Sequence, residues 1–122
     1  MDMKSGLEEL KKRREKALQM GGKARVEKQH QLGHLTARER IDKLLDPGTF
    51  SEVGILNQSD VPGMEDRTPA DGNIAGFGKI DGRTVVVCAA DHTVLAGAEG
   101  RVGTFAKEAR TTKIAVEKGC PI

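Results

Sequence analysis

The chain has 122 residues, a net charge of +2 at pH 7 and three aromatic residues, all of them phenylalanine. This length allows one small domain, and so few large apolar side chains allow only a modest core. No apolar run approaches the roughly 18 residues of a membrane span and residues 1–20 lack a signal-peptide core, so the sequence predicts a soluble protein.

The charges are divided unevenly along the chain. Residues 1–43 contain twelve Lys and Arg against seven Asp and Glu, whereas residues 44–122 contain eight against eleven. A basic N-terminal part could meet nucleic acid or phosphorylated ligands, or it could be a solvated helical face. It has no aromatic residue, so base stacking is excluded and a nucleic acid could be held only by its phosphates.

Two helices are predicted at the start of the chain. Ser5-Gly6-Leu7-Glu8 has the form of a capping box, and the helix that follows should end at Gly21-Gly22. Its apolar stripe is narrow, so this helix must dock on a larger surface or pair with another chain. A second, shorter helix is expected over residues 24–31, before Gly33.

The third predicted helix lies in LTARERIDKLLDPGTF. Thr36 is its expected N-cap, Glu39 closes a capping box, and Asp46-Pro47-Gly48 ends the helix. Its predicted buried face consists of Ile41, Leu44 and Leu45. The segment FSEVGIL then alternates like a short strand, and residues 57–71 have the composition of a long exposed loop.

A hairpin is predicted next, from the strand-like runs NIAGFGKI and RTVVVCAAD. They are joined by Asp81-Gly82, and a type I′ turn needs the positive φ that this dipeptide tolerates. The continuously apolar run at residues 85–90 should be covered on both faces. Cys88 and Cys120 are expected to be reduced and buried, as in a protein of the cytosol or of an organelle matrix.

A last helix is expected up to Gly119. The residues at helical spacing along it are Phe105, Ala109, Thr112 and Val116. Cys120-Pro121-Ile122 has the character of a further strand, so we expect the chain to be the N-terminal part of a longer protein.

The histidines suggest two sites, each with a simpler explanation. His30 and His34 are four residues apart and could share a metal, but Gly33 interrupts the helix and no acidic or Cys ligand is close in sequence. Ordinary surface histidines are favoured there, and no metal site is predicted. His92 follows Asp91 and could do acid–base chemistry, although no neighbouring nucleophile completes a site.

The stretch DHTVLAGAEGRVG joins the hairpin to the last helix and contains Gly97, Gly100 and Gly103. Glycine-rich turns before a helix can hold phosphates. The spacing here matches neither the dinucleotide fingerprint nor a P-loop, and Glu99 would repel a phosphate. A nucleotide site of either type is therefore not expected.

A longer pattern covers nearly the whole chain. The segment at residues 17–54 resembles the N-terminus of the carboxyltransferase (beta) subunits of biotin-dependent acyl-CoA carboxylases. These subunits are of the propionyl-CoA carboxylase beta and methylmalonyl-CoA decarboxylase alpha type. The sequence of the segment is ALQMGGKARVEKQHQLGHLTARERIDKLLDPGTFSEVG. The resemblance continues through Asp71-Gly72, GFGKIDGRTVVV and residues 90–94 to Gly119-Cys120-Pro121.

This resemblance implies an α/β fold of the crotonase type, in which β-β-α units stack into a spiral. Residues 1–46 would form an N-terminal helical segment, and residues 47–122 would begin the carboxyltransferase domain. The whole protein would move a carboxyl group between carboxybiotin and a propionyl-CoA-like acyl-CoA, in the cytoplasm or in a mitochondrial matrix. Its partners would be the biotin carboxyl carrier or biotin carboxylase subunit and further copies of itself, without a membrane.

The resemblance also implies that backbone N–H groups stabilise a thioester enolate. Those turns are expected beyond Ile122, so no catalytic residue is assigned here and the chain alone should be inactive. Many relatives have Thr-Val-x-Gly-Gly-Ser where this sequence has the longer stretch at residues 93–100. By position this turn should border the CoA cleft, with Gly97, Ala98 and Gly100 as the candidate contacts, or it only positions the helix.

Two alternatives to this function stay open. One is an interaction module without chemistry, whose helices dock on a larger partner. The other is a nucleic-acid-binding domain that uses the basic N-terminal part.

Overall fold

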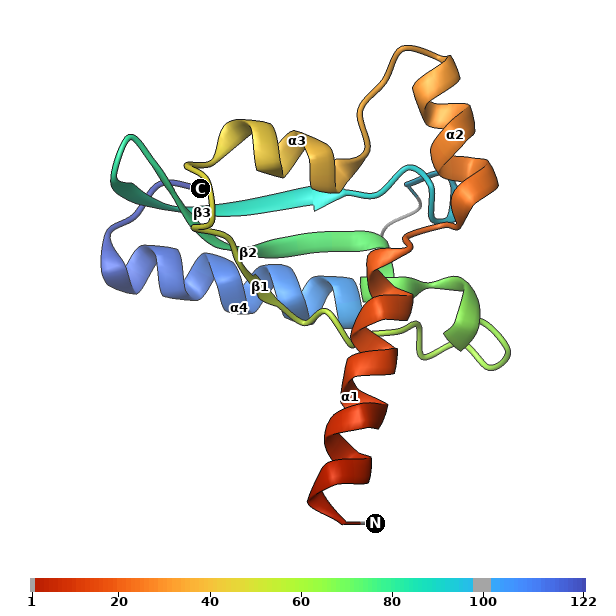
Figure 1. Ribbon diagram of the computed structural model, residues 1–122. Coiled ribbons are helices and arrows are strands. Elements are labelled where there is room, and N and C mark those ends of the chain that lie inside the picture. Colours follow the sequence, from red (N-terminus) through yellow and green to blue (C-terminus); the bar gives the residue numbers. More distant parts are fainter. Residues whose placement is uncertain (1, 98–101) are drawn as a thin grey trace.

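Figure 1 shows the computed structural model, which describes residues 2–97 and 102–122. Its regular elements, in chain order, are α1 (Met3–Leu18), α2 (Lys23–Gln31), α3 (Ala37–Leu44), β1 (Ser51–Val53), β2 (Asn73–Ile80), β3 (Arg83–Ala90) and α4 (Val102–Lys118). Three 3₁₀ turns, η1 (Glu65–Arg67), η2 (Pro69–Gly72) and η3 (Leu95–Gly97), lie between them. Within the described part, no helix is both long and apolar enough to cross a bilayer.

An antiparallel sheet in the order β1-β2-β3 forms the middle layer of the molecule. α3 lies on one face of the sheet and α4 on the other, while α1 projects away from the layers (Figure 1). The face toward α3 is apolar, and its buried cluster consists of Ala37, Ile41, Leu45, Ala70, Ile74, Val85 and Val87. Since α3 shares this core with the strands, the helix and the sheet are one packing unit. The division into a helical segment (residues 1–46) and the start of the carboxyltransferase domain (residues 47–122) stays a prediction.

α3 has the capping box that its sequence predicts. The Glu39 N–H donates to Thr36 Oγ1 at 3.2 Å, and the Thr36 N–H donates back to Glu39 Oε2 at 3.0 Å. Its buried stripe runs at a spacing of four through Ala37, Ile41 and Leu45. Leu44 falls to the side of that stripe and is 54% exposed, so the prediction that it is buried was wrong.

α1 begins earlier than its sequence pattern suggests. The Asp2 carboxylate accepts the Ser5 N–H at 2.7 Å, which makes Asp2 the N-cap and places Ser5 inside the helix. A capping residue must precede the first helical turn, and Asp2 is a strong N-cap in that position.

The hairpin between β2 and β3 is confirmed. Asp81 and Gly82 have φ of 49° and 78°, as a type I′ turn requires. Their N–H groups donate to Asp46 Oδ1 and Oδ2 at 2.9 and 2.8 Å. Asp46, which lies just beyond the C-cap of α3, therefore also holds the tip of the hairpin.

β3 is covered only in part. Val85, Val86 and Val87 are buried, but Cys88 is exposed, so the prediction that this cysteine is buried was wrong. β3 is the last strand of the sheet, and Val86 N–H donates to Pro121 O at 2.9 Å along its outer edge. Both cysteines are free, as expected.

α4 packs on the sheet through an unexpected face. The buried residues on it are Thr104, Lys107, Thr111 and Ala115. The helix itself was predicted, and Gly119 with φ of 68° follows its end. Phe105 and Val116, however, are 59% and 75% exposed. The apolar spacing in the sequence thus marks a face that the described residues leave uncovered.

Residues 57–71 are more ordered than a long exposed loop. η1 and most of η2 lie within them, and Ser59, Thr68 and Asp71 are buried. The Thr68 hydroxyl accepts the Ser59 N–H at 2.8 Å and donates to Met64 O at 2.9 Å. The Thr68 side chain thus supplies hydrogen bonds that the backbone of this segment would otherwise seek from water.

Candidate functional site

The end of β3 is held by a buried carboxylate. Asp91 Oδ1 accepts the Thr93 N–H at 2.9 Å and the Thr93 hydroxyl at 2.6 Å. Asp91 Oδ2 is also buried, and it has no hydrogen-bond partner among the residues that the structure describes. Leu95, Ala96 and Gly97 follow with φ of 47°, 53° and 76°, three successive left-handed residues that turn the chain sharply.

The junction of α1 and α2 packs against the same place. Gly21 N–H donates to Thr93 Oγ1 at 2.9 Å. A Cβ atom on Gly21 would lie 1.8 Å from the Thr93 carbonyl oxygen, so only glycine allows this approach. The N-terminal helices are therefore fixed to the turn that leaves β3.

The turn before β2 collects the next set of contacts. Ala70, Asp71 and Gly72 all have positive φ, of 52°, 53° and 67°. The Thr104 hydroxyl donates to Asp71 Oδ2 at 2.9 Å and lies 3.2 Å from Asp71 O. The Asp91 N–H donates to Gly72 O at 2.9 Å. We call residues 70–73 the anchor turn, because segments from both ends of the glycine-rich stretch bind to it.

Lys107 is a buried lysine at the anchor turn. It is 3% exposed, and its ammonium donates to Ala70 O and Asn73 O at 2.5 Å each. Burial lowers the pKa of Lys107 to about 8, although the carboxylates of Glu52 and Asp71 act in the opposite direction.

Asn73 extends the polar layer between β2 and α4. Its side-chain Nδ2 donates to Glu108 Oε1 at 2.7 Å. The opposite face of the sheet holds the apolar core with α3. Polar contacts thus gather on the α4 side, where the glycine-rich stretch begins and ends.

One of the three residues predicted to contact CoA lies in the described part, and it is Gly97. Its N–H donates to Val94 O at 3.0 Å, and a Cβ atom there would lie 3.1 Å from His92 Nδ1. Gly97 therefore packs on His92 and uses its N–H within the turn. Ala98 and Gly100 lie outside the described residues.

The histidines are divided between two environments. His30 Nε2 lies 2.7 Å from Glu39 Oε1, a surface pair beside the cap of α3. His34 and His92 instead line one hollow of about 620 Å³, together with Gln29, Leu32, Leu35 and Arg40. The described residues include no group of three His, Cys, Asp or Glu that could hold a metal ion.

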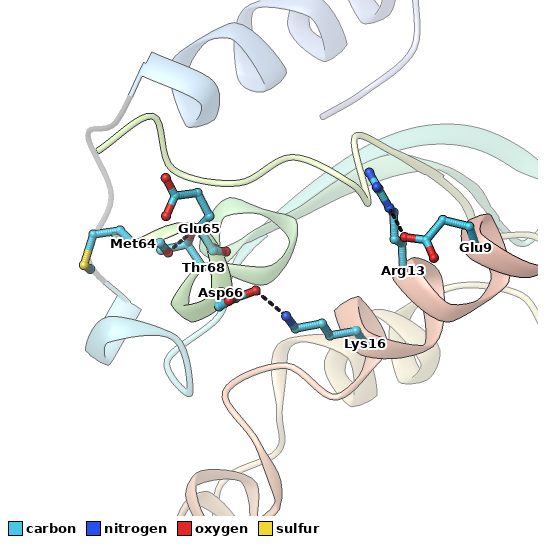
Figure 2. A network of polar contacts seen from close by, with 7 residues as sticks. All are labelled: Glu9, Arg13, Lys16, Met64, Glu65, Asp66 and Thr68. Carbon is cyan, nitrogen blue, oxygen red and sulfur yellow. Dashed lines mark hydrogen bonds and ion pairs between the residues drawn. The ribbon is translucent and has the colours of Figure 1, made fainter. Parts of the chain in front are cut away.

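A second cleft of about 460 Å³ separates α1 from residues 55–70. Figure 2 shows the polar network across it, in which Lys16 of α1 pairs with Asp66 of η1. The Lys16 ammonium lowers the pKa of the exposed Asp66 carboxyl. Arg13 donates to Glu9 Oε1 at 2.8 Å on the same helix. Several cations of the basic N-terminal part are thus paired with carboxylates within the chain.

Sequence reasoning missed the anchor turn and Lys107. Residues 57–71 were predicted as a long exposed loop, and nothing local indicates two left-handed non-glycine residues in succession at Ala70 and Asp71. A single lysine in a helix that carries other charges gives no sign of burial. The available signal was indirect: Thr104 and Thr111 lie on the face of α4 that is not its apolar stripe.

Known proteins resemble this chain over its whole length. Residues 28–122 match the model of the carboxyl transferase domain family. The carboxyltransferase subunit of propionyl-CoA carboxylase from Haloferax mediterranei is 44% identical over 126 residues, which cover 100% of this chain and 24% of that protein. The methylmalonyl-CoA carboxyltransferase 12S subunit of Propionibacterium freudenreichii is 39% identical over 98% of this chain and 23% of its own.

Solved structures agree with these relatives. A transcarboxylase 12S hexamer with bound methylmalonyl-coenzyme A and methylmalonic acid has a TM-score of 0.87 and 38% identity, and the match covers 98% of this chain and 24% of that one. The beta subunit of geranyl-CoA carboxylase from P. aeruginosa has a TM-score of 0.80 and 29% identity, over 98% of this chain and 22% of that one.

The β-β-α unit formed by β2, β3 and α4 has the crotonase-like α/β fold of the carboxyltransferases. The chain belongs to the carboxyl transferase domain family. It spans about a quarter of the length of the relatives that it matches.

Proposed function

We propose that the chain is the N-terminal quarter of the carboxyltransferase subunit of a biotin-dependent acyl-CoA carboxylase. The whole protein moves a carboxyl group between carboxybiotin and a propionyl-CoA-like acyl-CoA. The observation that carries this proposal is the match to a propionyl-CoA carboxylase subunit, which is 44% identical over 100% of this chain. The 12S structure with bound methylmalonyl-coenzyme A, a closely related thioester, supports the same substrate class.

The acyl-CoA is proposed to lie beside the turn that leaves β3. The hollow next to this turn offers the donor groups of Arg40, Gln29 and His92. Guanidinium, amide and imidazole N–H groups suit a ligand that carries phosphates, as coenzyme A does. Gly97, Ala98 and Gly100 remain the proposed contacts of the acyl-CoA.

The residues of this chain are proposed to bind and orient the thioester. The thioester makes the α-carbon acidic, and preorganised backbone N–H groups stabilise the enolate oxygen better than a titrating side chain would. The Gly97 N–H is already used by Val94 O at 3.0 Å, so it is a poor oxyanion donor. The oxyanion donors are therefore proposed to lie in the remaining three quarters of the protein, and the isolated chain is expected to be inactive.

Carboxybiotin supplies the carboxyl group and arrives on a carrier protein in this proposal. The further partners are a biotin carboxylase subunit and other copies of the same protein, since the related 12S protein is a hexamer. We propose that the assembly works in the cytoplasm, or in the mitochondrial matrix of a eukaryote.

The test is a carboxyl-transfer assay on the full-length protein that contains this chain. Labelled carboxybiotin on its carrier is offered together with acetyl-CoA, propionyl-CoA, butyryl-CoA or geranyl-CoA. The expected result is transfer to propionyl-CoA with the highest kcat/KM of the panel.

Two controls complete the assay. Reactions without the biotin carrier report carboxylation that does not depend on biotin, and the 122-residue chain alone should transfer nothing. If the full-length protein labelled none of the four thioesters, the proposed function would be wrong.

A further inference from the structure

The anchor turn has a backbone that needs outside support. Ala70 and Asp71 are left-handed residues with a Cβ atom, and each such residue costs roughly 1–2 kcal/mol. Three carbonyl groups of the turn and the Asp71 side chain accept hydrogen bonds from partners outside the turn. The Lys107 ammonium donates to Ala70 O and Asn73 O, the Thr104 hydroxyl donates to Asp71 Oδ2, and the Asp91 N–H donates to Gly72 O. Ala70 O also accepts the Asn73 N–H within the turn.

These partners come from the two ends of the glycine-rich stretch. Asp91 is the first residue after β3, and Thr104 and Lys107 lie in the first turns of α4. Both ends are therefore attached to the same four residues. The end of β3 and the start of α4 are therefore joined through a shared attachment.

Lys107 makes two of the four contacts and is the charged member of the set. Its side chain passes beside Gly54, where a Cβ atom would lie 2.8 Å from Lys107 Cε. An apolar side chain in its place would leave the buried Ala70 and Asn73 carbonyls without these donors. The charged and titratable groups that face the ammonium from the surrounding elements are Arg38, Glu52, Asp71 and Cys88.

We propose that Lys107 is a positioning residue of the acyl-CoA site, holding the two ends of the glycine-rich stretch at a fixed separation through the anchor turn. This inference rests on the proposed function. Lys107 itself is buried and touches no substrate; it acts through the backbone that borders the cleft.

The test compares Lys107→Met with Lys113→Met in the full-length protein. Lys113 lies on the same helix with a 76% exposed side chain and pairs only loosely with Glu117, at 3.9 Å, so its variant controls for the loss of a charge from α4. For Lys107→Met we expect kcat/KM for the acyl-CoA to fall about tenfold or more, since small displacements of a bound substrate have effects of this size. The KM for the biotin carrier should stay unchanged.

Hydrogen–deuterium exchange gives a second reading that does not depend on activity. In Lys107→Met, exchange should become faster in residues 70–73, 91–97 and 104–108 and stay unchanged in α3. If the wild-type protein transfers no carboxyl group, the proposed function fails, and this exchange pattern still decides whether Lys107 holds the two ends together.

Thr104→Val provides a milder variant in case Lys107→Met does not fold. It removes the hydroxyl contact to Asp71 and leaves the Lys107 ammonium in place. The acyl-CoA kcat/KM should therefore fall, and the exchange in these segments should become faster, both by less than in Lys107→Met. The proposal is overturned if folded Lys107→Met keeps the acyl-CoA kcat/KM of Lys113→Met. It is equally overturned if exchange rises evenly over the whole chain, because that pattern indicates only lost stability.

Discussion

Lys107 shows how one buried ammonium affects both geometry and stability. Its ammonium donates to two backbone carbonyls, and burial lowers its pKa to about 8 from 10.5. Between these pH values the unfolded chain binds more protons than the folded chain. The free energy of unfolding therefore rises as the pH increases from about 8 to 10.5.

Below pH 8 the charged form costs the fold about 3 kcal/mol relative to a neutral amine. We expect the free energy of unfolding of wild type to rise relative to that of Lys107→Met as the pH increases from 8 to 10. The free energy of unfolding of Lys113→Met should change with pH in the same way as that of wild type. Urea unfolding of the chain at several pH values measures both differences. Parallel curves for wild type and Lys107→Met would show that Lys107 ionises as it does in water.

Among the elements, α3 shows which structural features can be predicted from residues close together in the sequence. Its N-cap and capping box involve Thr36 and Glu39, three residues apart, and both were predicted correctly. The hairpin was predicted for the same reason, since Asp81 and Gly82 determine their own backbone conformation.

The contact that joins these two elements was not predictable in this way. Asp46 reaches the hairpin tip across 35 residues of sequence, and its local pattern indicated only the end of a helix. The anchor turn and the polar face of α4 depend on contacts of similar range. The fold class was recognised because the resemblance covers nearly the whole chain, which local propensity does not provide.

The Asp46 contact makes the hairpin dependent on the end of α3. Asp46→Ala should lower the free energy of unfolding by about 2 kcal/mol, because two hydrogen bonds to a carboxylate are lost. Asp46→Asn keeps one acceptor oxygen and should lose about half as much. Urea unfolding measures these changes.

Asp42→Ala provides the matched control, because Asp42 is an exposed acid on α3, close in sequence to Asp46. Its effect should be small. Equal losses for the Asp42 and Asp46 variants would mean that the hairpin tip does not need the carboxylate.

At the scale of the whole molecule, α4 divides an inner polar layer from an uncovered apolar stripe. Phe105 and Val116 lie on that stripe with 59% and 75% of their surface exposed. Contiguous apolar surface of this kind usually marks a contact with another part of a protein. The relatives are about four times longer than this chain, and the 12S relative is a hexamer.

We therefore expect the isolated chain to self-associate through α4. Replacing Phe105 and Val116 with serine should shift it toward the monomer, as measured by sedimentation velocity over a range of concentrations. Leu7→Ser is the control, since Leu7 on α1 is also 59% exposed. A monomeric wild type, or an equal shift for the Leu7 variant, would contradict this expectation.

The close contact between Gly21 and Thr93 also has an evolutionary meaning. Gly22, the neighbouring glycine, has open space around it and is constrained by its own φ of 97°. Gly21 is constrained by a carbonyl group 72 residues away in the sequence. The two adjacent glycines are thus required for different reasons. Only at Gly21 should substitutions among relatives coincide with changes in the backbone path at residue 93.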